Sequence, residues 1–329
     1  MLTERNGIYM QKAIGVLTSG GDAPGMNAAV RAVTRAAILK GYRVVGIQRG
    51  YNGLLHGETR ELNERDVSNV IQRGGTVLYT ARCLEFKEKK YQELGAAKCR
   101  ELGVEGMVVI GGDGSFMGAG ALSSLGIPCI GLPGTIDNDI ACTEYTIGYD
   151  TAMNTAVEMI DKLRDTAQSH DRCSVVEVMG RNAGWIALNV GLAVGAIGIF
   201  VPELKYDLNV LAEKMKKSQA NRKQHFIVVV AEGCDCGPEV ADKIKELTGI
   251  DSRYTTLGHV QRGGAPTLRD RVIASEMGYY AVELLANGAS NRIVGLKDGK
   301  VYDIDIQEGL AMKKTLDMNL YKVANEISF

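Results

Sequence analysis

The sequence predicts an α/β fold with mainly parallel sheets, and two observations support this. Short apolar segments rich in β-branched residues alternate along the chain with segments that have the periodicity of helices. This βαβα order favours parallel strands, because each helix crosses back over the sheet. Glycine is also frequent, with 40 residues against 6 prolines among 329, and it suits the tight turns of such a fold.

The predicted strands are short and apolar, and each ends at a glycine, a proline or a polar residue. They are 13–18 (AIGVLT), 43–48 (RVVGIQ), 106–110 (GMVVI), 128–132 (PCIGL), 174–179 (SVVEVM), 198–201 (GIFV) and 225–231 (HFIVVVA). Helices are predicted between them at 24–39, ended by Gly41, at 151–166 and at 209–218.

The segment 183–201 carries no charge and is apolar enough to suggest a membrane span. Its repeated glycines and the central Asn189 fit a different structure better. We expect a buried helix from Gly184 to Val194, followed by a short buried strand that ends before Pro202.

The composition is that of a soluble globular protein, with 45% hydrophobic and 23% charged residues. The length suits about two domains, and we expect a boundary near residues 149–154, although no low-complexity linker marks one. Lys and Arg number 38 against 39 Asp and Glu, a net charge of -1. This excludes an overall positive field that would attract nucleic acid or an anionic membrane, so local basic clusters must hold any bound anion.

The 7 cysteines are scattered without a CxxC pair, which indicates neither a disulfide framework nor a structural zinc site. Cys234 and Cys236 could form a metal-binding pair, but with no histidine nearby a loop at a strand end is favoured. The N-terminus is polar and lacks the apolar segment of a secretory signal. We therefore expect a cytoplasmic protein.

Two strand-end loops have the composition of phosphate-binding loops. In the loop 18–27, Gly20 and Gly21 allow close approach of a ligand to the backbone, and Pro24 stands where a helix would begin. In the loop 111–115, glycines flank Asp113, which could reach a Mg²⁺ ion. An ordinary tight turn, or an aspartate that caps the next helix, remains the alternative for each.

Two further loops carry charged side chains. In the loop 133–139, an extended backbone would point Asp137 and Asp139 the same way, one as a base and the other near a metal ion; an Asx-rich turn is the alternative. Arg181 follows another strand and could donate two hydrogen bonds to a phosphate. With Arg172, Arg253 and Arg262, these loops favour phosphoryl transfer between a nucleotide and a phosphorylated small molecule.

Together these loops resemble those of the bacterial-type ATP-dependent 6-phosphofructokinases (the phosphofructokinase A family). TSGGDAPGMNA, GGDGS, PGTIDND, VVEVMGR and GHVQRGG occur in the family's order and spacing, from Met10 over nearly the whole chain. The first nine residues precede the family's usual start, so they are either a disordered tail or the result of an upstream start codon. The resemblance implies phosphorylation of fructose 6-phosphate by ATP to fructose 1,6-bisphosphate and ADP, the committed step of glycolysis.

The resemblance also implies an architecture: two similar three-layer α/β domains, with the active site in the cleft between them, in a homotetramer. An ATP-binding domain would comprise 1–148 and 261–311. A domain that binds fructose 6-phosphate would comprise 149–260 and 312–329.

Site residues follow from the matched motifs. Asp137 would be the general base, Asp113 the carboxylate at Mg²⁺, and Thr135 and Arg181 would steady the transferring phosphoryl group. The implied ATP-binding residues are Gly21, Arg82, Cys83, Gly112, Asp113, Gly114 and Ser115. The implied substrate-binding residues are Thr135, Ile136, Asp137, Arg172, Met179, Gly180, Arg181, Glu232, Arg253, His259, Val260, Gln261 and Arg262, with Arg172 and Arg253 reaching in from a neighbouring subunit.

Part of the family's effector pocket for ADP or phosphoenolpyruvate is matched as well. Arg31 and Arg35 share a helix face by their i,i+4 spacing, and they match basic positions of the pocket together with Arg164 and Lys223. Glu64, Ile197 and Asn221 stand where an arginine, a metal-binding glutamate and a lysine are usual, although Arg65 and Arg222 lie one residue away. We expect weak effector responses; a merely solvated helix face at Arg31 and Arg35 is the alternative.

Three rival functions are disfavoured. Pyrophosphate-dependent relatives typically have Asp and Lys where this chain has Gly114 and Gly134. A nucleotide-sensing homologue would lack the base, whereas Asp137 is present. A dinucleotide dehydrogenase would carry G-x-G-x-x-G in the first loop, which is absent.

Overall fold

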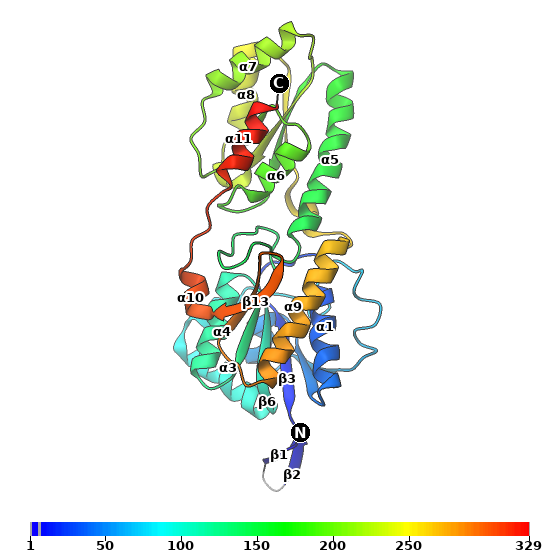
Figure 1. Cartoon of the computed structure of the whole chain (residues 1–329), viewed down its shortest axis with the longest axis vertical. Coiled ribbons are helices and arrows are strands. Elements are labelled where there is room, and N and C mark those ends of the chain that lie inside the picture. The colour runs from blue at the N-terminus through cyan, green and yellow to red at the C-terminus, as the bar shows by residue number, and fades with distance from the viewer. Residues whose placement is uncertain (1, 6–7, 329) are drawn as a thin grey trace. The chain divides into compact units, whose positions relative to one another are not determined.

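Two α/β units make up the structure, a computed structural model that describes residues 2–5 and 8–328. The chain passes between the units several times (Figure 1). The first unit comprises Met1–Ile136, Ile140–Asp150 and Arg262–Lys314, and the second comprises Asp137–Asp139, Thr151–Gln261 and Thr315–Phe329.

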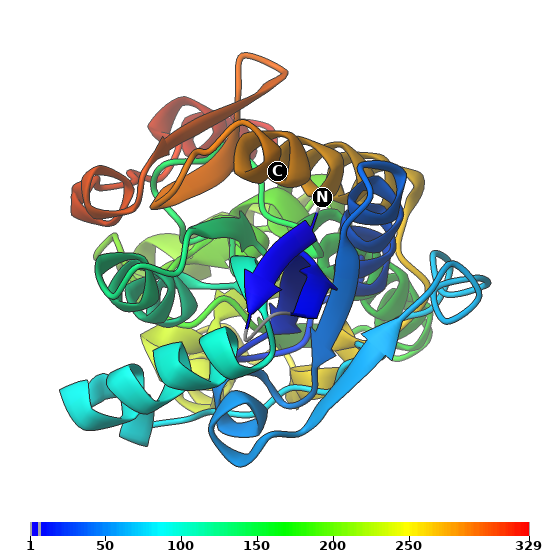
Figure 2. The ribbon, with the colours of Figure 1, turned by 90° about the horizontal axis from the view of Figure 1, so that it is seen from below.

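A seven-stranded sheet forms the centre of the first unit, in the order β13-β12-β7-β6-β3-β4-β5. The strands from β12 to β4 pair in parallel, and β13 and β5 pair antiparallel at the two edges. Helices α1 and α9 pack together on one face, and α2, α3, α4 and α10 contact one another on the other (Figures 1 and 2). Helices thus cover both faces, which explains why β3 is buried at every position.

The bounds of the elements of the first unit are as follows. The strands are β3 (Ala13–Thr18), β4 (Arg43–Ile47), β5 (Thr59–Leu62), β6 (Val104–Gly111), β7 (Cys129–Pro133), β12 (Arg292–Lys297) and β13 (Lys300–Asp305). The helices are α1 (Met26–Leu39), α2 (Gly50–His56), η1 (Glu85–Lys87), α3 (Lys89–Glu101), α4 (Asp113–Ser124), α9 (Leu268–Ala286) and α10 (Ile306–Ala311).

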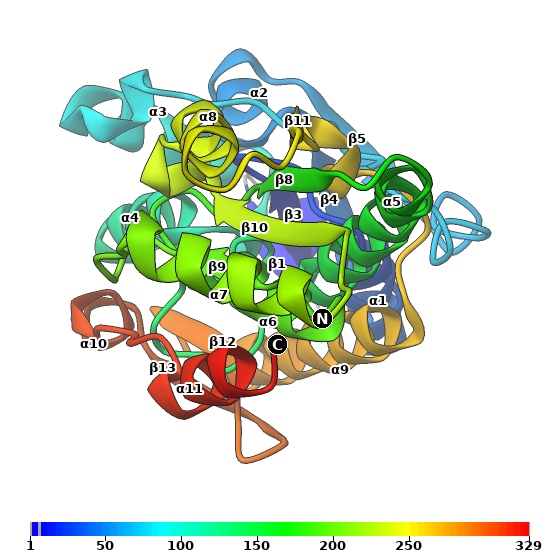
Figure 3. The same ribbon diagram turned by 90° about the horizontal axis from the view of Figure 1, so that it is seen from above.

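The second unit contains a four-stranded sheet in the order β11-β8-β10-β9, with every pair parallel. Helices α7 and α8 contact each other and close a core over β8 and β10, while α6 packs on β9 and β10 and against α11 (Figure 3). Strand β10 is buried at every position. This unit is therefore also a sheet between helical layers.

The bounds of the elements of the second unit are as follows. The strands are β8 (Cys173–Val178), β9 (Gly198–Phe200), β10 (Phe226–Ala231) and β11 (Ser252–Thr256). The helices are α5 (Tyr149–Ser169, which begins in the first unit), α6 (Trp185–Ala193), α7 (Leu208–Ala220), η2 (Glu232–Cys234), α8 (Gly237–Thr248), η3 (Gly258–Arg262) and α11 (Met318–Glu326).

The structure confirms the α/β prediction and most element bounds. Every predicted strand is present within two residues of its expected ends, and the predicted helices correspond to α1, α5 and α7. The uncharged segment 183–201 folds as α6 and β9, as expected, and no helix in the described part of the chain is both long and apolar enough to span a membrane. Strands β5, β11 and β13 were not predicted, because their sequences contain many polar residues, and the apolar run of β12 was not identified as a strand.

Before β3, residues Leu2–Arg5 (β1) and Ile8–Gln11 (β2) pair as a separate antiparallel sheet. Of the nine residues that precede the family's usual start, Met1, Asn6 and Gly7 lie outside the described residues, as does Phe329 at the other end of the chain.

Candidate active site

The glycine-rich loop after β3 and the start of α1 are held by hydrogen bonds to the segment 73–80. Asn27 accepts a hydrogen bond from the Val77 N–H at 2.7 Å, and the Thr80 hydroxyl donates to the Gly20 carbonyl at 2.8 Å. Gly25 is the N-cap of α1 with φ 107°, a conformation that favours glycine, and provides no capping side chain. No side chain therefore caps the first N–H groups of α1, although the Met26 N–H donates to the Ala23 carbonyl at 3.1 Å.

The loop after β6 lies directly against the loop after β3, because the two strands are neighbours in the sheet. A Cβ on Gly111 would be 2.5 Å from the Ser19 carbonyl oxygen, and the Ser115 hydroxyl donates to that same oxygen at 3.2 Å. Gly112 and Gly114, in contrast, have no atom within 4 Å of where a Cβ would stand. Asp113, the first residue of α4, is exposed beside this open space.

Arg262 belongs to the first unit, and its side chain contacts the loop after β3. A Cβ on Gly21 would be 2.6 Å from Arg262 Nη1, and this nitrogen donates to the Asp22 carbonyl at 3.1 Å. The first unit thus brings together Gly21, Ser115 and Arg262. Of the other residues implied in nucleotide binding, Arg82 is exposed, and Cys83 is half-buried with a pKa raised by burial.

The loop after β7 corrects one expectation. Asn138 adopts φ 51°, in the left-handed region, so the segment 137–139 is not extended. The prediction that Asp137 and Asp139 point the same way from an extended backbone is therefore wrong: Asp137 is fully buried, whereas Asp139 is partly exposed. Asp137 forms an ion pair with Arg181, with 3.0 Å between Oδ2 and Nε.

The turn 179–181, which carries Arg181, is held from two sides. The Glu232 carboxylate accepts from the N–H groups of Gly180 at 3.1 Å and of Arg181 at 2.6 Å. The side-chain oxygen of Gln261, a buried residue, accepts from the Met179 N–H at 2.9 Å. The segments that follow β8, β10 and β11 thus contribute five predicted site residues to one group of polar contacts, and Arg181 joins Asp137 to it. His259 and Val260 are exposed in the adjoining η3.

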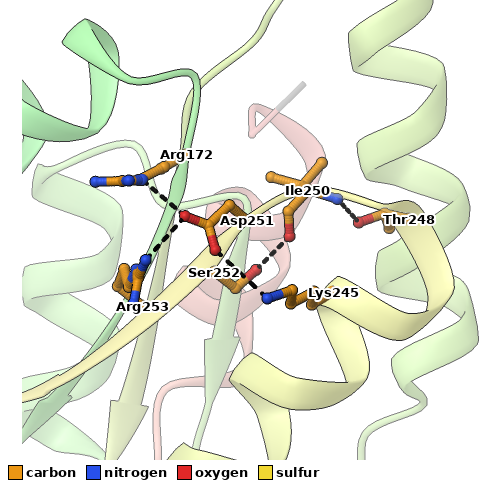
Figure 4. A network of polar contacts seen from close by, with 7 residues as sticks. All are labelled: Arg172, Lys245, Thr248, Ile250, Asp251, Ser252 and Arg253. Atoms are coloured by element: carbon orange, nitrogen blue, oxygen red, sulfur yellow. Dashed lines mark hydrogen bonds and ion pairs between the residues drawn. The ribbon is translucent and has the colours of Figure 1, made fainter.

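Arg172 and Arg253 lie elsewhere in the second unit. Arg172 precedes β8 and Arg253 is the second residue of β11, so both are near the amino end of the sheet, whereas Arg181 follows the carboxyl end of β8. Asp251 binds both, with 2.8 Å from Oδ2 to Arg172 Nε and 3.3 Å to Arg253 Nη2 (Figure 4). Asp251 was not predicted as a site residue, although it stands two residues before Arg253 in the sequence.

The basic residues of the implied effector pocket are divided between the two units. Arg35 is exposed and Arg31 half-buried on α1. In the second unit, partial burial and then the charge of Arg164 lower the pKa of Lys223, so these two cations are neighbours. Ile197, where the family would have a metal-binding glutamate, is buried in the core of this unit.

Comparisons with known proteins agree with the motifs. The family model described as Phosphofructokinase matches residues 13–285. A curated "ATP-dependent 6-phosphofructokinase" from Clostridium botulinum is 55% identical over 317 residues, 96% of this chain and 99% of the relative. An "ATP-dependent 6-phosphofructokinase 1" from Clostridium perfringens is 54% identical over the same shares.

Among solved structures, phosphofructokinase from Saccharomyces cerevisiae matches with a TM-score of 0.87 and 33% identity; the match covers 97% of this chain but only 48% of the yeast chain, so this chain spans about half its length. A pyrophosphate-dependent phosphofructokinase from Marinobacter aquaeolei matches with a TM-score of 0.83 at 23% identity, over 94% of this chain and 86% of the other. At that identity, the likeness bears on the fold alone.

Proposed function

The chain belongs to the phosphofructokinase family, and we propose that it transfers the γ-phosphoryl group of ATP to the 1-hydroxyl of fructose 6-phosphate, giving fructose 1,6-bisphosphate and ADP. The observation that carries the proposal is the fully buried Asp137 carboxylate paired with Arg181. A buried carboxylate is a suitable proton acceptor for the attacking hydroxyl, and the arginine beside it places a positive charge where a phosphoryl group would arrive.

In this mechanism Asp137 removes the proton of the 1-hydroxyl as its oxygen attacks the γ-phosphorus. Arg181, whose side chain is 49% exposed, holds the base and donates from its remaining N–H groups to the phosphoryl oxygens. Thr135, two residues after the end of β7, is proposed to steady the same phosphoryl group. Glu232 and Gln261 keep the turn 179–181 in place, which fixes Arg181 relative to the base.

The loops of the first unit are proposed to bind ATP. Asp113 is an exposed carboxylate beside two open glycines, and Mg²⁺ is commonly held by one or two carboxylates plus substrate phosphates. The residues therefore fit a Mg²⁺ ion, which would neutralise charge on the phosphates. A Cβ on Gly134 would be 2.9 Å from Ile110 Cγ2, which leaves little room for the lysine that pyrophosphate-dependent relatives typically have there.

We further propose that the second unit binds fructose 6-phosphate and that the enzyme is a homotetramer. Strand β8 has 6 residues and separates Arg172 from Arg181, which corresponds to roughly 20 Å. The two arginines of one chain therefore lie at opposite ends of one strand. This supports the proposal that they bind different substrate molecules. The cysteines are all free thiols, which suits an enzyme of the cytoplasm.

A side-by-side assay with ATP and with pyrophosphate, each with Mg²⁺ and fructose 6-phosphate, tests the proposed reaction. We expect turnover with ATP to exceed turnover with pyrophosphate. Faster turnover with pyrophosphate would contradict the choice of donor. ATP binding without turnover on either donor would identify a nucleotide-sensing homologue instead.

Effector responses are expected to be weak. The buried Ile197 removes an oxygen ligand for the effector's Mg²⁺, and Glu64 adds a negative charge near a phosphate. We expect ADP and phosphoenolpyruvate each to shift half-saturation for fructose 6-phosphate by less than about tenfold, a coupling free energy below about 1.4 kcal/mol. Titration of each effector at fixed ATP measures the shift, and a larger one would indicate a working pocket.

A further inference from the structure

We propose that Asp251 is a positioning residue that holds Arg172 and Arg253 ready for the phosphate of the sugar substrate. The inference rests on the proposed function, because the arginines' role comes from it. Neither the motifs nor the comparisons assign Asp251 a role.

The three side chains are brought together by the register of the sheet. Strands β8 and β11 are parallel neighbours with Cys173 opposite Ser252, so Arg172 and Asp251 occupy equivalent places just before their strands. The Cys173 N–H donates to the Asp251 carbonyl at 3.0 Å and fixes the two strand starts relative to each other. One Asp251 side-chain oxygen then lies 2.8 Å from Arg172 Nε and 3.3 Å from Arg253 Nη2 (Figure 4).

The carboxylate keeps two like charges close together. Without it, the guanidinium groups of Arg172 and Arg253 would repel each other and occupy many rotamers. Lys245 adds a third cation, 3.8 Å from the other Asp251 oxygen. Desolvation acts to raise the pKa of the Asp251 carboxyl, but the charges of Arg253, Arg172 and Lys245 hold this pKa below its usual value. The carboxyl group therefore remains ionised near neutral pH.

The contacts leave both arginines able to bind a phosphate. Asp251 meets Arg172 at Nε and Arg253 at Nη2, one nitrogen of each guanidinium group, and an arginine has five N–H donors. The side chain of Arg253 is 65% exposed and that of Arg172 34%. Two cations fixed in advance lose less conformational freedom when an anion arrives, so binding of the phosphorylated substrate should be tighter.

The test is the Asp251→Asn variant, which keeps the shape of the side chain and removes its charge. We expect KM for fructose 6-phosphate to rise roughly tenfold, the size typical of losing a charge-assisted hydrogen bond. We expect kcat and KM for ATP to change less than about twofold, since the base and the nucleotide loops are untouched. Asp251→Glu should recover most of the affinity.

Two further variants separate positioning from a structural effect. Glu246→Gln removes an exposed ion pair with Lys243, 2.7 Å long, on the neighbouring helix α8, and it should leave both KM values unchanged. In an Arg253→Ala background, Asp251→Asn should raise KM by a smaller factor than in the wild type, because only Arg172 is then left to position and residues that act through one another are not additive.

Each outcome has one meaning. Wild-type protein that does not phosphorylate fructose 6-phosphate contradicts the proposed function, and the role of Asp251 with it. If the wild type is active, an unchanged or lowered KM in Asp251→Asn overturns only the role of Asp251. An unchanged KM would mean that the carboxylate has no effect on substrate binding, and a lowered KM that it competes with the phosphate. The role of Asp251 is also overturned if Glu246→Gln raises KM by a similar factor. The same holds if Asp251→Asn raises KM by as large a factor in the Arg253→Ala background as in the wild type.

Discussion

At the scale of single residues, the buried pair of Asp137 and Arg181 is the most informative contact. Asp137 has no exposed surface, and a buried charge requires a partner. Arg181 provides it from a backbone with φ 53°, a conformation unusual for a residue other than glycine. Two hydrogen bonds from the turn to Glu232 hold this conformation in place. Strain of this kind is often found at functional sites.

Removing the charge of Asp137 tests its role as the base. In Asp137→Asn the shape is kept but the side chain no longer accepts the proton, so we expect kcat to fall by roughly 10² to 10⁴-fold. KM for fructose 6-phosphate should change far less. Steady-state kinetics beside the Asp139→Asn variant measure both. A variant that keeps more than a tenth of the wild-type kcat would assign the base elsewhere, with Asp139 the next candidate.

A buried cysteine predicts how stability depends on pH. Cys173 is fully buried at the start of β8, and desolvation raises the pKa of its thiol to about 12. In the unfolded chain the pKa is about 8.5. The group therefore contributes stability that is complete below about pH 8.5 and is lost as the pH rises towards 12, by about 1.4 kcal/mol per pH unit.

Cys173→Ser should weaken this dependence, because a hydroxyl does not ionise in that range. Urea denaturation at pH 7.5, 9 and 10 measures it, followed by the fluorescence of Trp185, the single tryptophan, which lies in α6 of the same unit. Cys99→Ser, in the first unit, is the matched control. An alkaline loss of stability as steep in Cys173→Ser as in the wild type would argue against this assignment.

At the scale of elements, the order of strands determines which loops meet. Loops after β3 and β6 touch because those strands are neighbours, and Ser115 bonds to Ser19 across the junction. In the second unit, the loops after β10, β8 and β11 meet around Arg181 for the same reason. This is the general position of ligand sites in parallel sheets.

Two glycines of the segment 111–115, where β6 leads into α4, should respond differently to substitution by alanine. Gly111→Ala would bring a Cβ within 2.5 Å of the Ser19 carbonyl oxygen, a backbone atom, so we expect a loss of stability of about 1–3 kcal/mol. Gly114→Ala meets nothing within 4 Å and lies in helix α4, where alanine is favoured, so its Tm should equal or exceed that of the wild type.

The same pair of variants separates folding from nucleotide binding. If the open space at Gly114 receives ATP, Gly114→Ala should raise KM for ATP despite its unimpaired Tm. Thermal denaturation and ATP titration of both variants check this. Equal Tm values for Gly111→Ala and Gly114→Ala would contradict the close approach at Gly111.

At the scale of the whole molecule, the division into units passes through the loop that carries the proposed base. Ile136 and Ile140 belong to the first unit, while Asp137–Asp139 belong to the second. Thr135 and Asp137, two residues apart in the chain, are thus parts of different units. The proposed base therefore belongs to the second unit, where it pairs with Arg181.

Subunit mixing tests whether the second pair of arginines acts in a neighbouring chain. If it does, mixing Arg253→Ala chains, assayed far below their raised KM for fructose 6-phosphate, with Asp137→Asn chains should restore part of the activity, since a hybrid interface combines an intact base with an intact arginine. Mixing Asp137→Asn with Arg181→Ala is the control and should restore none, because Asp137 and Arg181 meet within one chain. Absence of restoration after verified subunit exchange would contradict the action in trans.

The α/β class and the core strands could be predicted from the sequence, because buried parallel strands are continuous apolar runs. The glycines and charges that follow these strands led to the proposed site residues. The sequence could not determine which loops meet, because strand order joins residues far apart in the chain. The turn at Asn138, the pairing of Asp137 with Arg181 and the placement of Asp251 between two arginines arise from backbone conformation and sheet register. Only the tertiary structure decides such contacts, because each depends on elements that no local pattern links.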